Sequence, residues 1–411
     1  MAIDLRARLE KLVPMHPTVG FIRFNLPDQD QIHTRNRIFQ SRLIDEFSKP
    51  PRPAFPYSRN ELTAKLGNLE AHENPVETMR KLHEDGMLEI AEFFKTNYDP
   101  RLASLQLSEL RQCLVTWAFR LAAIETPANL ALLLGGSAAN GVHTFRTDFD
   151  FVVIPHAPED REAARLVQLK MAGLMLAFNL EADWVMPGNF AYSPLEEIEK
   201  KYIQLVNPTE IDKQVNGFMF NASASFYRFL MDVRVIGVFS REKGFLEKGM
   251  DFAARLGRIQ SNLIFSAPAH VIENCRADYA SKLILSSQPD EKFVLNIKLN
   301  PLRLFHYALY AGRAKLGIRE SNFWNVIDKL EIAGLLSGTE AKESRRLLKF
   351  FIGMRHLIGL TVKKNIDSTK LQEDGVDVMA KKLGVNKNGL VEMVKRLSAE
   401  MVARARLIIE K

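Results

Sequence analysis

The stretch over residues 130–154 constrains the fold of this chain more than any other. An apolar run of five residues ends in the small residues of a Gly-Gly-Ser segment at 135–137, and a second apolar run begins at Asp148 and Asp150. In an extended strand, residues i and i+2 lie on the same face, so these two carboxylates point the same way. The pattern predicts a strand, a tight turn and a second strand that carries two acidic side chains together.

The residue types around this turn indicate phosphate and metal chemistry. Two carboxylates held this close repel each other unless a cation lies between them, and hard oxygen ligands of this kind suit Mg²⁺. Leaving them unpaired beside Phe149 and Phe151, which continue a buried-looking strand, would carry a large desolvation cost. Gly135, Gly136 and Ser137 would let the backbone approach a phosphate closely. The alternative interpretation is local, because paired aspartates also form turns and cap helices.

Composition sets broad limits on the class of protein. A chain of 411 residues is long enough for two or three domains. Its formal net charge of +7 and pI of about 9.2 are compatible with binding of nucleotides, tRNA or an acidic protein, and also with an ordinary solvated surface that binds none of them. Cys113 and Cys275 lie far apart in the sequence, which argues against a disulfide framework. No apolar stretch approaches the ~20 residues needed to span a bilayer, and the N-terminus lacks a signal-peptide core. We therefore expect a cytoplasmic protein without a membrane partner.

The order of helical and strand patterns predicts four regions. Prolines near residue 50 mark residues 1–60 as an arm or linker, and residues 61–125 read as helical. Residues 126–258 alternate strands and helices, with strands expected at 130–134, 148–154 and 180–186. Beyond residue 259 every segment reads as helix with short connections, which favours an antiparallel helical bundle over 259–411. The sequence lacks the P-loop and Rossmann glycine motifs, which disfavours those modes of nucleotide binding.

The glycine-serine turn and the Asp-x-Asp strand resemble the signature of the DNA polymerase β-like nucleotidyltransferase superfamily. From Gly136 the interval reads Gly-x11-Asp-x-Asp, the form found in the adenylyl- and uridylyl-transferases that modify glutamine synthetase and its PII regulator, and in the DUF294-type nucleotidyltransferases. The last group typically carries Gly-Ser-Glu-Gly-Arg-Gly-Glu-Gln-Thr before Thr-Asp-x-Asp. The matching residues here are Gly136, Ser137, Gly141, Thr144, Thr147, Asp148 and Asp150. The departures are Asn140 in place of arginine and Val142-His143 in place of Glu-Gln.

This resemblance covers roughly residues 95–411 and implies both a fold and a metal site. The fold is α+β, a polymerase β-like nucleotidyltransferase domain with a small mixed sheet flanked by helices, preceded by N-terminal helices and followed by a helical bundle that binds substrate. The metal is Mg²⁺, with Mn²⁺ as a substitute, held by Asp148 and Asp150. A third carboxylate on a neighbouring strand completes the site, and Asp183 is the expected residue, with Glu181 as the alternative. Asp183 is also expected to assist deprotonation of the acceptor.

The resemblance also assigns nucleotide-binding residues. Gly135, Gly136 and Ser137 would contact phosphates, and Arg146 could compensate for the missing arginine at position 140, or be a solvated loop residue. Lys298 could reach phosphates across the domain cleft, or serve as a surface charge.

Several further residues carry less specific expectations. Arg355 resembles another family arginine that could reach phosphates. Asp232 and Arg234 resemble a Phe-Asp-x-Arg motif, and their spacing in a strand predicts a structural ion pair. His143 lies in the phosphate loop, where it could contact ligand or be incidental.

The resulting expectation is an Mg²⁺-dependent nucleotidyltransferase. It would move an NMP, with AMP or UMP favoured, from an NTP to a hydroxyl on a protein or small molecule. One alternative is a regulatory protein with the same fold that senses a nucleotide but catalyses no reaction. Asn140 and Val142, which depart from the family's loop, suggest this alternative. Another is an RNA-modifying nucleotidyltransferase. Only the excess of basic over acidic residues supports it, so a nucleic acid partner is not favoured.

Overall fold

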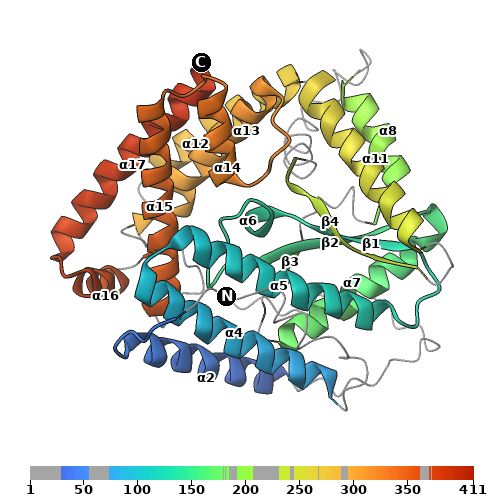
Figure 1. The fold of residues 1–411 in the computed structure, drawn as a ribbon, viewed down its shortest axis with the longest axis horizontal. Helices are drawn as coiled ribbons and strands as arrows, with labels where there is room; N and C mark the ends of the chain where they lie inside the picture. Colours follow the sequence, from blue (N-terminus) through green and yellow to red (C-terminus); the bar gives the residue numbers. More distant parts are fainter. Residues whose placement is uncertain are drawn as a thin grey trace.

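Helices dominate the computed structural model of this chain, and a small sheet lies among them (Figure 1). The structure describes residues 29–54, 74–178, 180, 182–184, 192–206, 231–240, 245–266, 268–287, 295–361, 370–371 and 373–411. The expected class, α+β with a small sheet flanked by helices, is confirmed at this level.

The sheet has the strand order β3-β2-β1-β4. Its central strand β1 (Leu130–Leu134) pairs antiparallel with β2 (Phe149–Pro155) and with β4 (Arg234–Phe239), and the short β3 (Ala182–Trp184) adds to β2 in parallel. Every residue of β1 is buried, which explains why its sequence is a continuous apolar run instead of an alternating one. The strand predicted at 130–134 is therefore confirmed at its predicted bounds.

Two helices lie against the sheet and against each other. Helix α5 (Pro100–Ala123) packs on β1, β4 and α7, and α7 (Arg161–Ala177) packs on β2 after the short turn η2 (Pro158–Asp160). Asp99 caps α5, because its side chain accepts from the backbone N–H groups of the first turn. Helix α11 (Phe245–Ser266) packs on β4 and on α8 (Leu195–Val206).

The segment expected to be an arm contains a 20-residue helix, α2 (Gln29–Ser48). Its apolar residues Phe39, Leu43 and Phe47 recur every four positions, form one face and are buried where α2 packs on α4 (Pro75–Asn97). Residues 1–28 and 55–73 lie outside the described residues.

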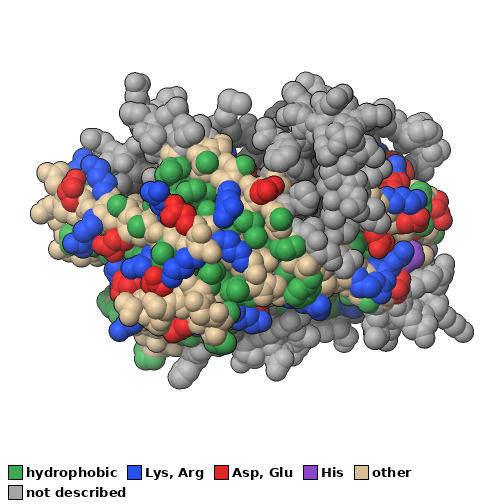
Figure 2. Space-filling view, turned by 90° about the horizontal axis from the view of Figure 1, so that it is seen from above, with side chains coloured by type: hydrophobic (Ala, Val, Ile, Leu, Met, Phe, Trp, Pro, Cys, Tyr) green, Lys and Arg blue, Asp and Glu red, His purple; other side chains and the backbone are tan. Residues whose placement is uncertain are grey.

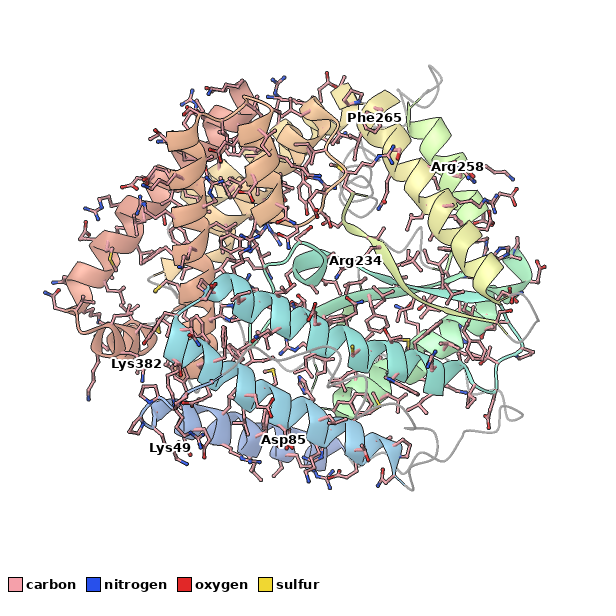
Figure 3. The ribbon with its side chains drawn as sticks, in the orientation of Figure 1. Lys49, Asp85, Arg234, Arg258, Phe265 and Lys382 are labelled. Carbon is pink, nitrogen blue, oxygen red and sulfur yellow. The ribbon has the colours of Figure 1, made fainter. Side chains whose placement is uncertain are left out.

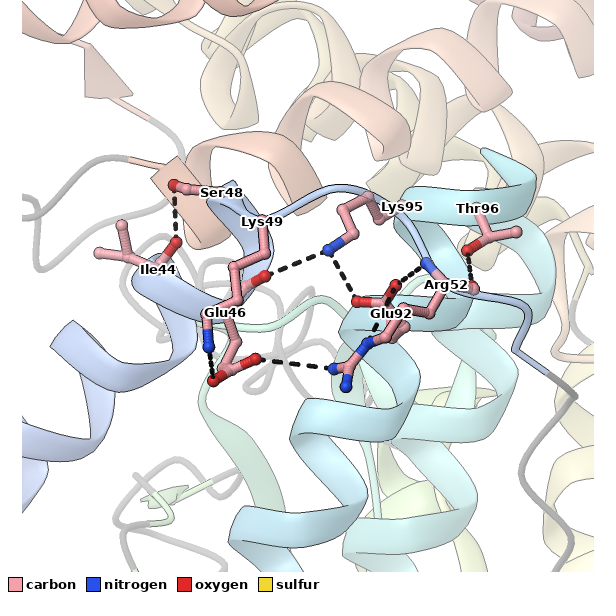
Figure 4. A network of polar contacts seen from close by, with 8 residues as sticks. All are labelled: Ile44, Glu46, Ser48, Lys49, Arg52, Glu92, Lys95 and Thr96. Atoms are coloured by element: carbon pink, nitrogen blue, oxygen red, sulfur yellow. Dashed lines mark hydrogen bonds and ion pairs between the residues drawn. The ribbon is translucent and has the colours of Figure 1, made fainter.

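A polar network fixes the chain that leaves α2 onto α4 (Figure 4). Lys95 is buried, donates to the carbonyl oxygen of Glu46 at 3.1 Å and pairs with Glu92 at 2.7 Å. The backbone N–H of Arg52 donates to Glu92, and the Thr96 hydroxyl donates to the Arg52 carbonyl oxygen at 2.7 Å. Residues 46–52 therefore follow α4 in a defined path.

The C-terminal region is helical, and its helices pack on one another and on the N-terminal helices. They are α12 (Pro268–Ser287), α13 (Arg303–Leu316), α14 (Phe323–Ile332), α15 (Gly338–Thr361), α16 (Glu373–Leu383) and α17 (Lys387–Glu410). Helix α13 packs against α12, α14 and α17, whereas α15 also contacts α2 and α5. The boundary expected at residue 258 lies inside α11, and one connected apolar core runs from Phe39 to Ile409.

Two short features interrupt the region that was predicted to be entirely helical. Leu295–Asn296 (β5) pairs antiparallel with Lys370–Leu371 (β6), and Lys298–Leu302 forms a π-helical turn, η3, that contains Pro301. The prediction was wrong here because a two-residue ladder depends on a partner far away in the sequence and has no periodic signature of its own.

Within the described part of the chain, none of the helices is both long and apolar enough to cross a membrane. On the face seen in Figure 2, side chains of Lys and Arg are interspersed with those of Asp and Glu.

Candidate functional site

The acidic pair lies at the start of β2. Asp148 directly precedes the strand and Asp150 is its second residue, and both are half-buried, whereas Phe149 and Phe151 are buried in the core. The alternation predicted from the sequence is therefore present at the start of the strand, where the two acidic residues are half-buried; further along the same face, Val152 and Ile154 are buried.

The glycine turn and Asp150 are in direct contact. The N–H of Gly135 donates to the carbonyl oxygen of Asp150 at 3.0 Å, which continues the ladder between β1 and β2 past the end of β1. Gly136 follows with φ +59°, and a Cβ atom added there would lie 1.7 Å from Oδ2 of Asp150. Only glycine fits, both for its backbone conformation and because the carboxylate lies against its Cα atom.

The third predicted carboxylate is adjacent to this pair in the backbone register. Asp150 pairs with Asp183 across the parallel β2–β3 ladder, which puts both positions on the same face of the sheet. The side chain of Asp183, and Glu181 entirely, lie outside the described residues. Among the side chains that are described, no group of three or more His, Cys, Asp or Glu could hold a metal. Asp148 and Asp150 supply carboxylate oxygens suited to Mg²⁺, and the role of Asp183 stays a prediction.

The loop between the turn and β2 is held by a buried arginine that the sequence analysis did not single out. Arg111 of α5 is 3% exposed, and its guanidinium donates to the carbonyl oxygens of Thr144 and Thr147, each at 3.1 Å, and of Phe145 at 2.7 Å. The N–H groups of a guanidinium lie in one plane, which suits three carbonyl oxygens that converge on it. Arg111 therefore fixes the backbone path that leads into Asp148. Nothing in the local sequence signals this role, because every residue type has a backbone carbonyl group and the acceptors therefore leave no pattern in the sequence.

His143 lies between Arg111 and the glycine-serine turn. Its Nε2 atom is 2.5 Å from Nη1 of Arg111, and its Nδ1 atom is 2.9 Å from the hydroxyl of Ser137. The ring is fully buried and stands edge-on to Phe149. Burial first, and then the charge of Arg111, hold the pKa of His143 well below its ordinary value, so the ring is neutral.

Asn140, which replaces the arginine of the resembled family, faces the C-terminal helices. Its amide donates to the hydroxyl of Tyr310 at 3.0 Å, and that hydroxyl donates to Oδ2 of Asp232 at 2.5 Å. Burial raises the pKa of Tyr310 well above its ordinary value, with Asp232 adding to the shift, so the hydroxyl keeps its proton. The neighbouring backbone is joined as well, since the indole of Trp324 donates to the carbonyl oxygen of Gly141 at 3.0 Å.

Among the described residues, Asp232 and Arg234 do not form the ion pair that the sequence predicted. Asp232 is buried ahead of β4, 4.0 Å from the guanidinium of Arg313. Arg234, at the first position of β4 (Figure 3), is exposed and donates to the side chain of Gln112 at 3.0 Å. The prediction failed because it assumed that both residues lie in one strand, whereas the strand begins only at Arg234.

Arg355, one of the basic residues expected near phosphates, lies beside the loop. Arg355 is buried and donates to the hydroxyl of Thr147 at 3.1 Å, next to Asp148 in the sequence. The pKa of His306 is lowered to about 3, first by burial and then by the positive charges of Arg355, Arg303 and Lys298. In the described part of the chain, no hydrogen bond or ion pair joins Lys298 to the acidic pair.

Arg146 is not a solvated loop residue. It is half-buried, with Nε and Nη2 shielded from solvent, and its Cγ atom lies 3.6 Å from the position that a Cβ on Gly359 of α15 would take. Its stem therefore packs against α15, and a contact with phosphate stays a prediction.

Comparisons with known proteins add no relative. No model of a known protein family matches the chain, and no curated protein matches it.

Proposed function

We propose that this chain is an Mg²⁺-dependent nucleotidyltransferase with a polymerase β-like catalytic domain. It would transfer an NMP, with AMP or UMP favoured, from an NTP to a hydroxyl on a protein or small molecule. The observation that carries the proposal is the contact between turn and strand: the carboxylate of Asp150 lies over Gly136, and half-buried Asp148 lies two residues before it.

This arrangement suits phosphoryl chemistry for three reasons. Paired carboxylates on one side of a strand offer the oxygen ligands that Mg²⁺ prefers. Because Gly136 has no Cβ atom, the carboxylate of Asp150 lies directly against the backbone of the turn, so a metal ion held by this carboxylate would be next to the N–H groups that bind phosphate oxygens. Arg111 holds the connecting loop in place, so the two parts of the site are held together before any ligand arrives.

The residues of the site would have the following roles in the reaction. Asp148 and Asp150 hold Mg²⁺, which when bound neutralises the charge that develops on the phosphates. Ser137 and the backbone of the turn bind phosphate oxygens and orient the chain of phosphates. Asp183, from the neighbouring strand, completes the ligand set and accepts the proton of the attacking hydroxyl.

The test is transfer of label. The full-length protein would be incubated in lysate with each α-labelled NTP and Mg²⁺ or Mn²⁺, and the labelled macromolecule or metabolite would then be isolated. We expect Asp148→Asn and Asp150→Asn each to abolish transfer, whereas Asp251→Asn, an exposed carboxylate on α11, leaves it unchanged. Transfer that survives both site variants refutes the assignment.

Asn140 favours a second candidate on the same fold, a regulatory protein that binds Mg-NTP without turnover. The loop position that carries arginine in the resembled family is occupied here by a buried amide bonded to Tyr310, which removes one cation from the phosphates. Calorimetric binding of Mg-NTP, together with no release of pyrophosphate for any acceptor fraction, would select this candidate over the transferase.

A further inference from the structure

A buried chain of polar contacts connects helix α5 to the glycine-serine turn. Arg111 contacts Nε2 of His143 at 2.5 Å, and Nδ1 of the same ring lies 2.9 Å from the hydroxyl of Ser137. Arg111 and His143 are buried, and Ser137 at the turn is half-buried. The contacts therefore run from the interior to the rim of the candidate site.

The donor inventory fixes the direction of these hydrogen bonds. A guanidinium has N–H donors and no acceptor, so Nε2 of His143 accepts from Nη1 of Arg111, whose two N–H groups are shared among this nitrogen and the carbonyl oxygens of Thr144 and Thr147. A neutral imidazole that accepts at Nε2 carries its proton on Nδ1. Nδ1 therefore donates to Ser137, and the serine oxygen is the acceptor.

The consequence concerns the remaining proton of Ser137. A hydroxyl has one proton and two lone pairs, and one lone pair is taken by His143. With the described residues, the contact to His143 is the one hydrogen bond of the Ser137 side chain. The O–H group therefore stays available as a donor to a ligand, at the residue that follows Gly136 and its contact with Asp150.

We propose that His143 is a positioning residue, held by Arg111 in the Nδ1–H form so that the Ser137 hydroxyl acts as a hydrogen-bond donor to an anionic phosphate oxygen. Without the ring, the hydroxyl could turn its proton toward the protein and present a lone pair to the ligand. The identity of the ligand rests on the proposed function; the direction of the two hydrogen bonds does not.

The experiment is a double-mutant cycle on ligand binding. The full-length protein and the variants Ser137→Ala, His143→Phe and the double variant would be titrated with Mg²⁺ and non-hydrolysable analogues of ATP and UTP. We expect each single variant to weaken binding about 10-fold, as for the loss of one hydrogen bond to a charged group, and the double variant to bind no more weakly than either. Thermal unfolding of each variant checks that it is folded.

A conservative variant separates positioning from packing. His143→Asn keeps an amide nitrogen near the position of Nδ1, and we expect it to restore most of the lost affinity although it fills the core less well than His143→Phe. Losses that add up to about 100-fold in the double variant overturn the proposal, because His143 would then act independently of Ser137. Binding by His143→Phe at the wild-type affinity overturns it too.

The direction of the hydrogen bonds has its own readout. Ring-¹⁵N-labelled histidine distinguishes the two neutral forms by NMR, and the His143 signals are assigned by their loss in His143→Asn. We expect protonated Nδ1 and unprotonated Nε2. If the wild-type protein binds none of the Mg-NTP analogues, the proposed function fails; an Nε2–H form of His143 overturns the positioning role whether or not a nucleotide binds.

Discussion

Removing a single hydroxyl, in Tyr310→Phe, tests how the loop after the turn is joined to the C-terminal helices. The hydroxyl is buried, accepts from the amide of Asn140 at 3.0 Å and donates to the carboxylate of Asp232 at 2.5 Å. A hydrogen bond to a charged group contributes about 1.5–3 kcal/mol and one between neutral groups about 0.5–1.5 kcal/mol. Because both partners remain buried, we expect the free energy of unfolding to fall by about 2–4 kcal/mol.

The assay is urea unfolding at pH 7, followed by tryptophan fluorescence and by circular dichroism. Trp324 is a local reporter, since its indole donates to the carbonyl oxygen of Gly141 in the same loop. Tyr98→Phe is the matched control, because Tyr98 is 51% exposed and its ring contact with Phe94 is kept in the variant. A loss for Tyr310→Phe as small as that of the control would refute the reasoning, since the buried network would then make no net contribution to stability.

Three further perturbations follow from the structure. Gly136→Ala forces a side chain into φ +59° and against the carboxylate of Asp150, so we expect Mg²⁺-dependent nucleotide binding to be lost in calorimetry; wild-type affinity would contradict the geometry of the turn. Burial lowers the pKa of His83 from 6.5 to about 3, so between these values the unfolded chain takes up a proton that the folded chain does not. Stability should therefore fall as the pH drops below about 6.5, by up to ~1.4 kcal/mol per pH unit for this ring. His83→Gln should flatten the pH dependence of the urea midpoint by that amount, and an unchanged slope would count against a neutral buried ring. Lys95→Met removes the bond to the end of α2, so hydrogen exchange of residues 44–52 should speed up about 10-fold. The control Lys49→Met, at an exposed ion pair, should leave it unchanged, and equal exchange in both variants would refute the role of the buried lysine.

Much of the local structure could be predicted because its signals are local. The run at 130–134 forms a buried strand, and the alternation from Asp148 to Phe151 separates half-buried from buried residues as expected. Helix α4 begins at Pro75, where Asn74 caps the free N–H groups and proline fits the first turn. Each of these outcomes depends on neighbours within a few residues.

The candidate site could be predicted only in part. The acidic pair and the glycine turn are sequence patterns, and the structure puts Asp150 against Gly136. Arg111 could not be found in this way, because it binds backbone carbonyls 33 to 36 residues further along the chain. Asp232 was assigned the wrong partner, since spacing within a presumed strand says nothing about the side chains that a distant helix brings to it.

The amino-acid sequence alone set the strand at 130–134, the glycine turn with the acidic pair that follows it, and the chemical character of that turn, because propensity, capping and alternation act over a few residues. The tertiary structure decided which side chains meet: the ring of His143 between Arg111 and Ser137, and Tyr310 between Asn140 and Asp232. Such contacts form because burial forces polar groups to find partners, and only the packing of elements far apart in the chain determines which partners are within reach.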